Sequence, residues 1–280
     1  MSRVHRGARL ALSLAMVATL LGVTAVAVSA EGSESKATYN SVPRDLPGNV
    51  ISQAFQATQT SEFGDSVALG AGPRRAASVD VMMSSWGCQS GSWTTGDCVT
   101  RHEATFSHPI TLNLYAVDAV TGQPGALLLS KTQTFAIPFR PSANAAKCTL
   151  GRWYSRADKA CYNGLATTIT FKLNGTVLPT KVIWTVAFNT SGYGAAPLGY
   201  GTACATSVAG CGYDSLNVGA ETFAGQPSRG TDVDANGAVL NSATPAQYCD
   251  GGTGGFGFLR LDTAPGCWTD YKPLATIRTR

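Results

Sequence analysis

The chain has 280 residues, of which 21 are basic and 17 acidic, and its formal net charge is +4. Arg3, Arg6 and Arg9 precede an N-terminal apolar run, and without them 18 basic and 17 acidic residues remain. A nearly neutral chain without a basic stripe cannot neutralise many phosphates, so nucleic acid is excluded as an expected partner.

The first thirty residues have the three parts of an export signal. Basic residues precede an apolar run over 10–28, and Val28-Ser29-Ala30 provides a small-x-small cleavage site. A membrane anchor is the alternative, because the run approaches the roughly 20 residues that span a bilayer. Polar or small residues interrupt it, however: Ser13, Thr19, Gly22 and Thr24. We therefore predict a signal peptide over 1–30, no membrane anchor after cleavage, and a secreted, extracellular protein.

The segment after the cleavage site is short and polar and lacks large apolar residues. Residues 31–38 are therefore predicted to be a flexible leader. We found no Pro-rich linker beyond it, so residues 39–280 are expected to form a single β-sandwich domain. Two subdomains divided near 141–161 are the alternative.

Apolar residues of the mature chain recur mostly at every second position, which is typical of strands with one buried face. The clearest alternation covers 77–84, where Asp80 lies opposite the valines and is expected to face solvent. Further strands are expected at 110–115, 169–173, 182–188, 216–218, 256–261 and 274–279. Turn residues that tolerate positive φ separate them, at 121–125, 163–164, 174–175 and 236–237.

Many short strands, 31 glycines, 13 prolines and no long helical periodicity favour an all-β fold. The expected architecture is an antiparallel β-sandwich, with a jelly roll as the first choice.

All eight cysteines follow the signal segment, and an even number in an exported chain predicts disulfides. They form four neighbouring couples separated by 10, 13, 7 and 18 positions. We predict bridges between neighbours, which would pin loops rather than join sheets: Cys88 with Cys98, Cys148 with Cys161, Cys204 with Cys211, and Cys249 with Cys267.

The motif Asp232-Val233-Asp234-Ala235-Asn236-Gly237 has the D-x-D-x-N-G pattern of a calcium loop. Asp232, Asp234 and Asn236 are its candidate ligands, and calcium is the one cofactor that the sequence suggests. Ala243 stands where an EF-hand would have glutamate, so a helix-flanked EF-hand is not expected. The alternative is a polar turn without an ion.

The sequence assigns no catalytic residue. His102 and His108 do not form the H-E-x-x-H motif of a zinc site, and no G-x-S-x-G elbow is present. Glycoside hydrolysis would need two carboxyl groups about 5 to 10 Å apart, which a sequence cannot measure.

Aromatic residues border the cysteine loops and suggest a ligand-binding surface. Trp93, Trp153, Tyr154 and Trp268 are the candidates, because flat rings on disulfide-fixed loops can stack on the apolar faces of sugars. The alternative is that these rings plug the end of the sandwich. Trp184, in an alternating strand, is expected in the core.

Several segments carry a resemblance to known proteins. Ser52–Phe55, Ala77–Val81, Ile110–Tyr115 and Gly122–Leu128 resemble, in that order, the jelly-roll choice-of-anchor domains of secreted bacterial surface proteins. The segments 181–190, 213–218 and 271–273 are similar to exported actinobacterial β-sandwich proteins. The resemblance implies a jelly roll and no catalytic residues. It departs from anchored members after Tyr271, where neither a sorting motif nor an apolar tail follows.

These features together predict a secreted, non-catalytic module that binds a glycan or another cell-envelope component. One alternative is an exported polysaccharide-active hydrolase or lyase, which would require an acid and a base in one cleft. The other is a structural envelope protein with protein partners, which an exposed apolar patch would indicate.

Overall fold

The computed structural model describes residues 34–56, 58–190, 192–197, 215–242, 255, 257–263 and 268–280. Within these ranges the chain forms β-strands and no helix. The strands are β1 (Lys36–Asn40), β2 (Ser52–Ala54), β3 (Thr60–Ala68), β4 (Ala76–Ser85), β5 (Thr105–Val117), β6 (Pro124–Pro138), β7 (Trp153–Ser155), β8 (Ala160–Tyr162), β9 (Leu165–Lys172), β10 (Lys181–Ala187), β11 (Leu216–Gly219), β12 (Thr231–Asp232), β13 (Ala238–Ser242), β14 (Arg260–Asp262) and β15 (Ala275–Thr279).

One antiparallel sheet has the order β1-β15-β4-β11-β2, and β9 also pairs with β4. Val79 of β4 lies opposite Ile277 of β15 and Phe171 of β9. The first and last strands of the described chain are therefore neighbours, since β15 pairs with β1 on one side and with β4 on the other.

The second antiparallel sheet has the order β14-β13-β3-β10-β5-β6, and the short β12 pairs with β3. Strand β10 lies between β3 and β5 and is buried over most of its length. A third, two-stranded sheet is the β7–β8 hairpin.

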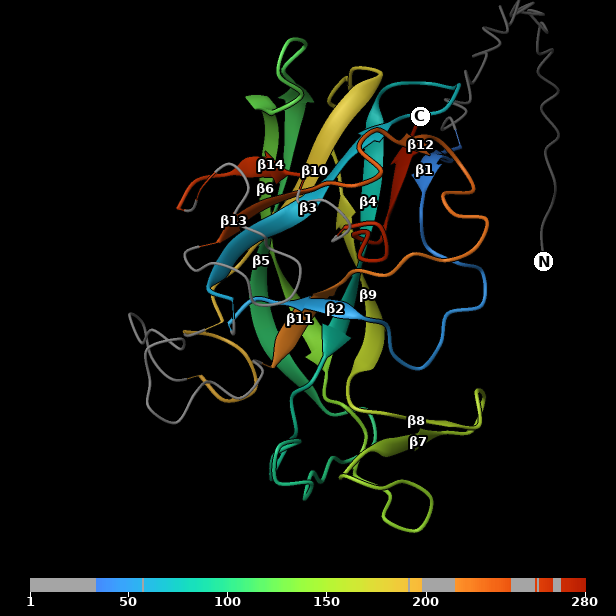
Figure 1. The fold of residues 1–280 in the computed structure, drawn as a ribbon, viewed down its shortest axis with the longest axis vertical. Helices are drawn as coiled ribbons and strands as arrows, with labels where there is room; N and C mark the ends of the chain where they lie inside the picture. Colours follow the sequence, from blue (N-terminus) through green and yellow to red (C-terminus); the bar gives the residue numbers. More distant parts are fainter. Residues whose placement is uncertain are drawn as a thin grey trace, which may run out of the picture. The chain divides into compact units, whose positions relative to one another are not determined.

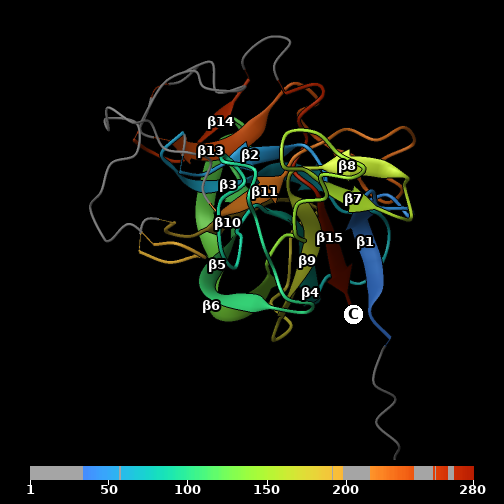
Figure 2. The same cartoon turned by 90° about the horizontal axis from the view of Figure 1, so that it is seen from below.

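The two larger sheets pack face to face, and Figure 2 shows β9, β15 and β1 in one layer and β3, β10 and β5 in the other. Alternate residues of each strand form the core between the layers. Val79 and Val81 of the first sheet join Leu112 and Trp184 of the second in one buried cluster. Trp184 thus lies in the core, as the sequence predicts.

This arrangement confirms an all-β, antiparallel sandwich, while the jelly-roll assignment stays a prediction. Residues Glu34–Arg280 form one compact unit. The expected flexible leader over 31–38 is wrong from Lys36 onward, because Lys36 and Ala37 pair with Thr279 and Arg278. Backbone pairing with the last strand orders this segment although its side chains are small or polar.

Two of the predicted disulfides are present, Cys88–Cys98 and Cys148–Cys161. The other four cysteines lie outside the described residues. The loop after β4 and the β7–β8 hairpin lie below the two larger sheets in the view of Figure 1. The loop after β4 also contacts the segment between β6 and β7, since the Ala143 amide donates a hydrogen bond to the Cys98 carbonyl and the Arg140 amide donates one to the Gly87 carbonyl. The bridges therefore hold loops at one end of the sandwich.

Candidate functional site

A pocket of about 360 Å³ opens beside the disulfide-linked loops. Two aromatic side chains line it, Trp86 and Tyr162, and both are partly exposed. Trp86 lies two residues before Cys88, and Tyr162 directly follows Cys161, so each ring is attached to a disulfide-bonded segment. The remaining lining residues are Asn49, Val50, Ile51, Ser52 and Glu221. We call this hollow the aromatic pocket.

Neighbouring side chains fix the position of Trp86. Its indole Nε1 donates a hydrogen bond to Ser84 Oγ at 2.9 Å, and its ring contacts Trp93 edge-on with 4.8 Å between centroids. Ser84 Oγ in turn donates to Asn49 Oδ1 at 2.7 Å. Because both ends of the indole are held, little side-chain entropy remains to be lost when a ligand binds.

The ring of Tyr162 packs against that of Trp153, with 5.5 Å between the ring centroids. Trp153 is itself buried and donates a hydrogen bond from Nε1 to the Gly164 carbonyl at 2.6 Å. Partial burial and the nearby Asp158 carboxylate raise the pKa of Tyr162. The Asp158 carboxylate also accepts a hydrogen bond from the Tyr162 hydroxyl, which helps to fix the position of the ring.

The structure corrects the predicted set of ligand-binding aromatics. Trp153 and Trp268 are buried, with exposed fractions of 7% and 0%, so the prediction that they stack on sugars is wrong. Trp268 packs against Phe63 in the core. Trp93 supports Trp86, and Tyr154 carries the Lys147 ammonium 4.3 Å above its ring. Neither Trp93 nor Tyr154 lines the aromatic pocket.

Three carboxyl groups form a cluster where β12 pairs with β3. Asp65 comes from β3, Asp232 from β12, and Asp234 from the turn that follows β12. Their ligand oxygens all lie within 4.8 Å of one another. The antiparallel register explains this convergence, because Asp232 pairs with Val67 and the Val233 amide bonds to the Ser66 carbonyl. Continuing the pairing by one residue places Asp234 opposite Asp65.

Lys272 is the cation of this acidic cluster. Its ammonium lies 2.9 Å from Asp232 Oδ2 and donates hydrogen bonds to the main-chain carbonyls of Asp234 and Gly237. These three contacts satisfy the three donors of an ammonium group. Lys272 therefore fixes the turn that carries Asp234.

Burial dominates the electrostatics of the cluster. Desolvation raises the pKa of Asp65 well above its usual range, and the neighbouring Lys272 only partly offsets this effect. The same cause raises the pKa of Asp234 to about 8. Asp65 Oδ2 and both carboxylate oxygens of Asp234 receive no hydrogen bond from the described residues.

The predicted calcium loop is thus only partly reproduced. Asp232 and Asp234 come together, whereas Asn236 does not join them; its side-chain oxygen accepts a hydrogen bond from Thr269 at 2.9 Å. Asp65 is the third member of the cluster instead, and the loop motif does not include it because it is distant in sequence. The sequence does contain an indication of its role, because Asp65 shares a strand face with the apolar residues Phe63 and Val67, where a carboxyl group is unusual.

A second pocket, of about 420 Å³, lies over the acidic cluster. Asp232 and Lys272 line it, together with Tyr39 and Phe223. Glu221 lines both this pocket and the aromatic pocket, so the two hollows share a wall.

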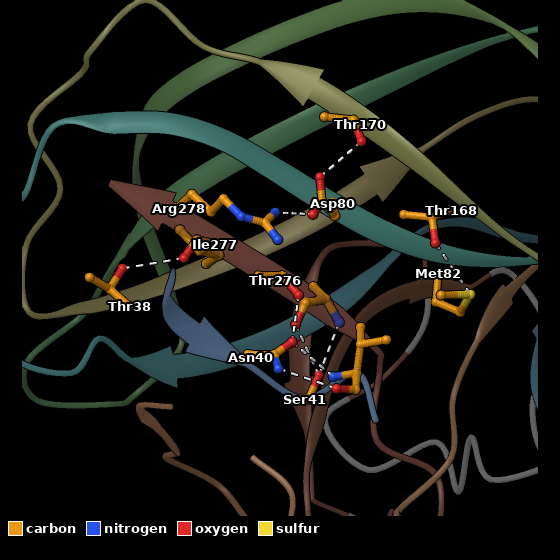
Figure 3. A network of polar contacts seen from close by, with 12 residues as sticks. Thr38, Asn40, Ser41, Asp80, Met82, Thr168, Thr170, Thr276, Ile277 and Arg278 are labelled. Carbon is orange, nitrogen blue, oxygen red and sulfur yellow. Dashed lines mark hydrogen bonds and ion pairs between the residues drawn. The ribbon is translucent and has the colours of Figure 1, made fainter. Parts of the chain in front are cut away.

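A third hollow, of about 470 Å³, lies on the outer face of the first sheet. Asp80 accepts a hydrogen bond there from the Thr170 hydroxyl and forms an ion pair with Arg278 (Figure 3). The outward orientation of Asp80 agrees with the sequence pattern. Among the residues lining this hollow, Asp80 is the one carboxyl group.

The histidine pair does not form a site. His102 is exposed and lies 3.9 Å from Glu103, whereas His108 is buried between aromatic rings. One ring is in solvent and the other in the interior, so they cannot share a metal ion.

No family model, no curated protein and no solved structure matches the chain. In the part of the chain that the structure describes, no helix is long and apolar enough to cross a membrane. The protein is thus an antiparallel β-sandwich with two disulfides, and the aromatic pocket lies at the end of the sandwich where the disulfide-linked loops are. The two bridges are compatible with an extracellular location.

Proposed function

We propose that the chain is a secreted, non-catalytic module that binds a saccharide of a polysaccharide or of the bacterial cell envelope in the aromatic pocket. The observation that carries the proposal is the pairing of two partly exposed rings, Trp86 and Tyr162, with polar groups in one hollow. Aromatic faces pack on the C–H faces of a sugar, while amide, hydroxyl and carboxylate groups hydrogen-bond its hydroxyls.

The chemistry of the pocket supports binding rather than hydrolysis. Glu221 is the one carboxyl group among its lining residues, and Glu221 Oε2 already accepts a hydrogen bond from the Ile51 amide at 2.9 Å. A glycosidase of the usual kind needs two carboxyl groups across the scissile bond. The neighbouring pocket adds one carboxyl group, that of Asp232, which is paired there with the Lys272 ammonium at 2.9 Å, while the buried acids Asp65 and Asp234 do not line it.

Secretion is supported by the export signal that the sequence predicts over 1–30 and by the two disulfides, since disulfides persist in oxidising compartments.

The test is a pull-down of the purified protein with insoluble polysaccharides and bacterial cell walls, with calcium and again with a chelator. We expect Tyr162→Ala to weaken retention by about tenfold, which corresponds to about 1.4 kcal/mol of lost ring contact. Tyr154→Ala is the matched control, because Tyr154 belongs to the same hairpin and lies outside the pocket. It should bind as the unsubstituted protein does.

Circular dichroism of both variants should show the same β spectrum, which separates a binding defect from misfolding. Equal retention of Tyr162→Ala and the unsubstituted protein would contradict the proposed pocket. The absence of retention on every polysaccharide and wall preparation would contradict saccharide binding itself.

A further inference from the structure

The geometry of the acidic cluster fits one hard divalent cation. Calcium takes oxygen ligands at about 2.3 to 2.6 Å, so two oxygens on the same ion lie at most about 5 Å apart. The oxygens of Asp65, Asp232 and Asp234 all lie within 4.8 Å of one another. They can therefore reach a common ion without movement of the strands that carry them.

Asp65 gives a second reason. It is completely buried, its Oδ1 accepts a hydrogen bond from the adjacent Ser66 amide, and its Oδ2 receives none from the described residues. One of its oxygens lies within 4.8 Å of the ligand oxygens of the other two carboxyl groups. Such a group is costly in a protein interior unless a cation or a proton compensates it.

The charge count points the same way. Three carboxylates surround one ammonium, that of Lys272, which leaves two negative charges in excess when all of them are ionised. A doubly charged cation would neutralise this excess. Lys272 has its own three acceptors in Asp232 Oδ2 and two main-chain carbonyls, and these leave Asp65 Oδ2 and the Asp234 carboxylate free for an ion.

We propose that Asp65, Asp232 and Asp234 bind one Ca²⁺, with water completing the coordination from the pocket that Asp232 lines. The site goes beyond the proposed saccharide binding and does not depend on it. Its ligands come from β3 and from the β12 turn, so ion binding would fasten this turn to the second sheet. The Asn236 side chain has no part in it.

The test is isothermal titration calorimetry of chelator-treated protein with CaCl₂ alone, without any saccharide. Extracellular calcium modules bind with Kd values of about 10⁻⁴ to 10⁻³ M, so the titration should reach about 5 mM. We expect one ion per chain, and an affinity at least about tenfold lower for Asp65→Asn because a charged ligand is lost. Asp232→Asn, at a partly exposed position, should lose as much and serves if Asp65→Asn does not fold.

Two controls decide between the sequence motif and the structural cluster. Asn236→Ala should keep its calcium affinity within about twofold, since Asn236 bonds to Thr269. Asp80→Asn, on the outer face of the other sheet, should also keep it. An affinity loss in Asn236→Ala equal to that in Asp65→Asn would overturn the proposed ligand set.

Thermal unfolding provides a second readout, because a ligand that binds the folded state raises Tm. We expect about 5 mM CaCl₂ to raise the Tm of the unsubstituted protein and to raise that of Asp65→Asn by less, in step with its lower affinity. The absence of both heat and a Tm shift in the unsubstituted protein would overturn the proposal, and would mean that protons and Lys272 alone compensate the cluster. Saccharide retention with a chelator is a separate measurement, so failure of one proposal does not imply failure of the other.

Discussion

Single residues in the interior carry much of the chemistry of this protein. Asp65 and His108 are both fully buried and both titratable. Neither residue type belongs to the apolar set that normally fills a core, so each couples the stability of the fold to a charge state.

His108 predicts a specific pH dependence. Burial lowers the pKa of His108 to about 4, whereas a histidine in the unfolded chain titrates near its usual value of 6.5. The unfolded state therefore takes up a proton first as the pH falls below 6.5. This contribution to stability is complete above that value and is lost as the pH falls toward 4, by up to about 3 kcal/mol.

The measurement is urea unfolding of the unsubstituted protein and of His108→Phe between pH 7 and pH 4. The variant should lose less of its unfolding free energy over this window, because its aromatic ring cannot take up a proton. His102→Gln is the control and should follow the unsubstituted protein, since His102 is exposed. Identical pH dependence of all three proteins would contradict the assignment to His108.

At the scale of elements, the two disulfides close short loops around the aromatic pocket. Each bridge spans 10 or 13 residues. In the chain-entropy model, closing a loop of this length stabilises the folded state by about 3 kcal/mol. We expect the double variants Cys88→Ser with Cys98→Ser, and Cys148→Ser with Cys161→Ser, each to lower the unfolding free energy by up to that amount.

The sandwich itself should survive both changes, because its core lies between the two larger sheets. Urea unfolding monitored by circular dichroism measures the loss, and saccharide retention should fall with it because Trp86 and Tyr162 lose their anchors. Unchanged unfolding midpoints in both double variants would contradict this role of the bridges.

For the whole molecule, the contacts between the first and last strands are decisive. Strand β15 lies between β1 and β4, and Ala275 and Ile277 belong to the core. Deleting 275–280 would break both ladders and expose the core between the sheets. We expect the shortened chain to lack cooperative thermal unfolding, whereas deletion of the exposed Arg280 alone should leave a cooperative transition. A cooperative transition in the longer deletion would contradict this.

The fold class, the two described disulfides and several strands could be predicted from the amino-acid sequence alone. Apolar and polar residues alternate over 77–84 and 110–115, and this pattern was enough to predict β4 and β5, because a strand with one buried face has a period of two. Strand β3 was missed because Gly64, Asp65 and Ser66 resemble a turn. The reason for Gly64 is tertiary: a Cβ there would lie 1.9 Å from the Trp184 main-chain oxygen.

Which side chains form sites depends on the tertiary structure. It placed Tyr162 beside Trp86, buried Trp153 and Trp268, and replaced Asn236 by Asp65 in the acidic cluster. Local patterns report which residues can share a strand or a turn. The pairing of β12 with β3 and the approach of the two disulfide loops join segments far apart in the chain, and such contacts follow from how the sheets pack rather than from sequence spacing.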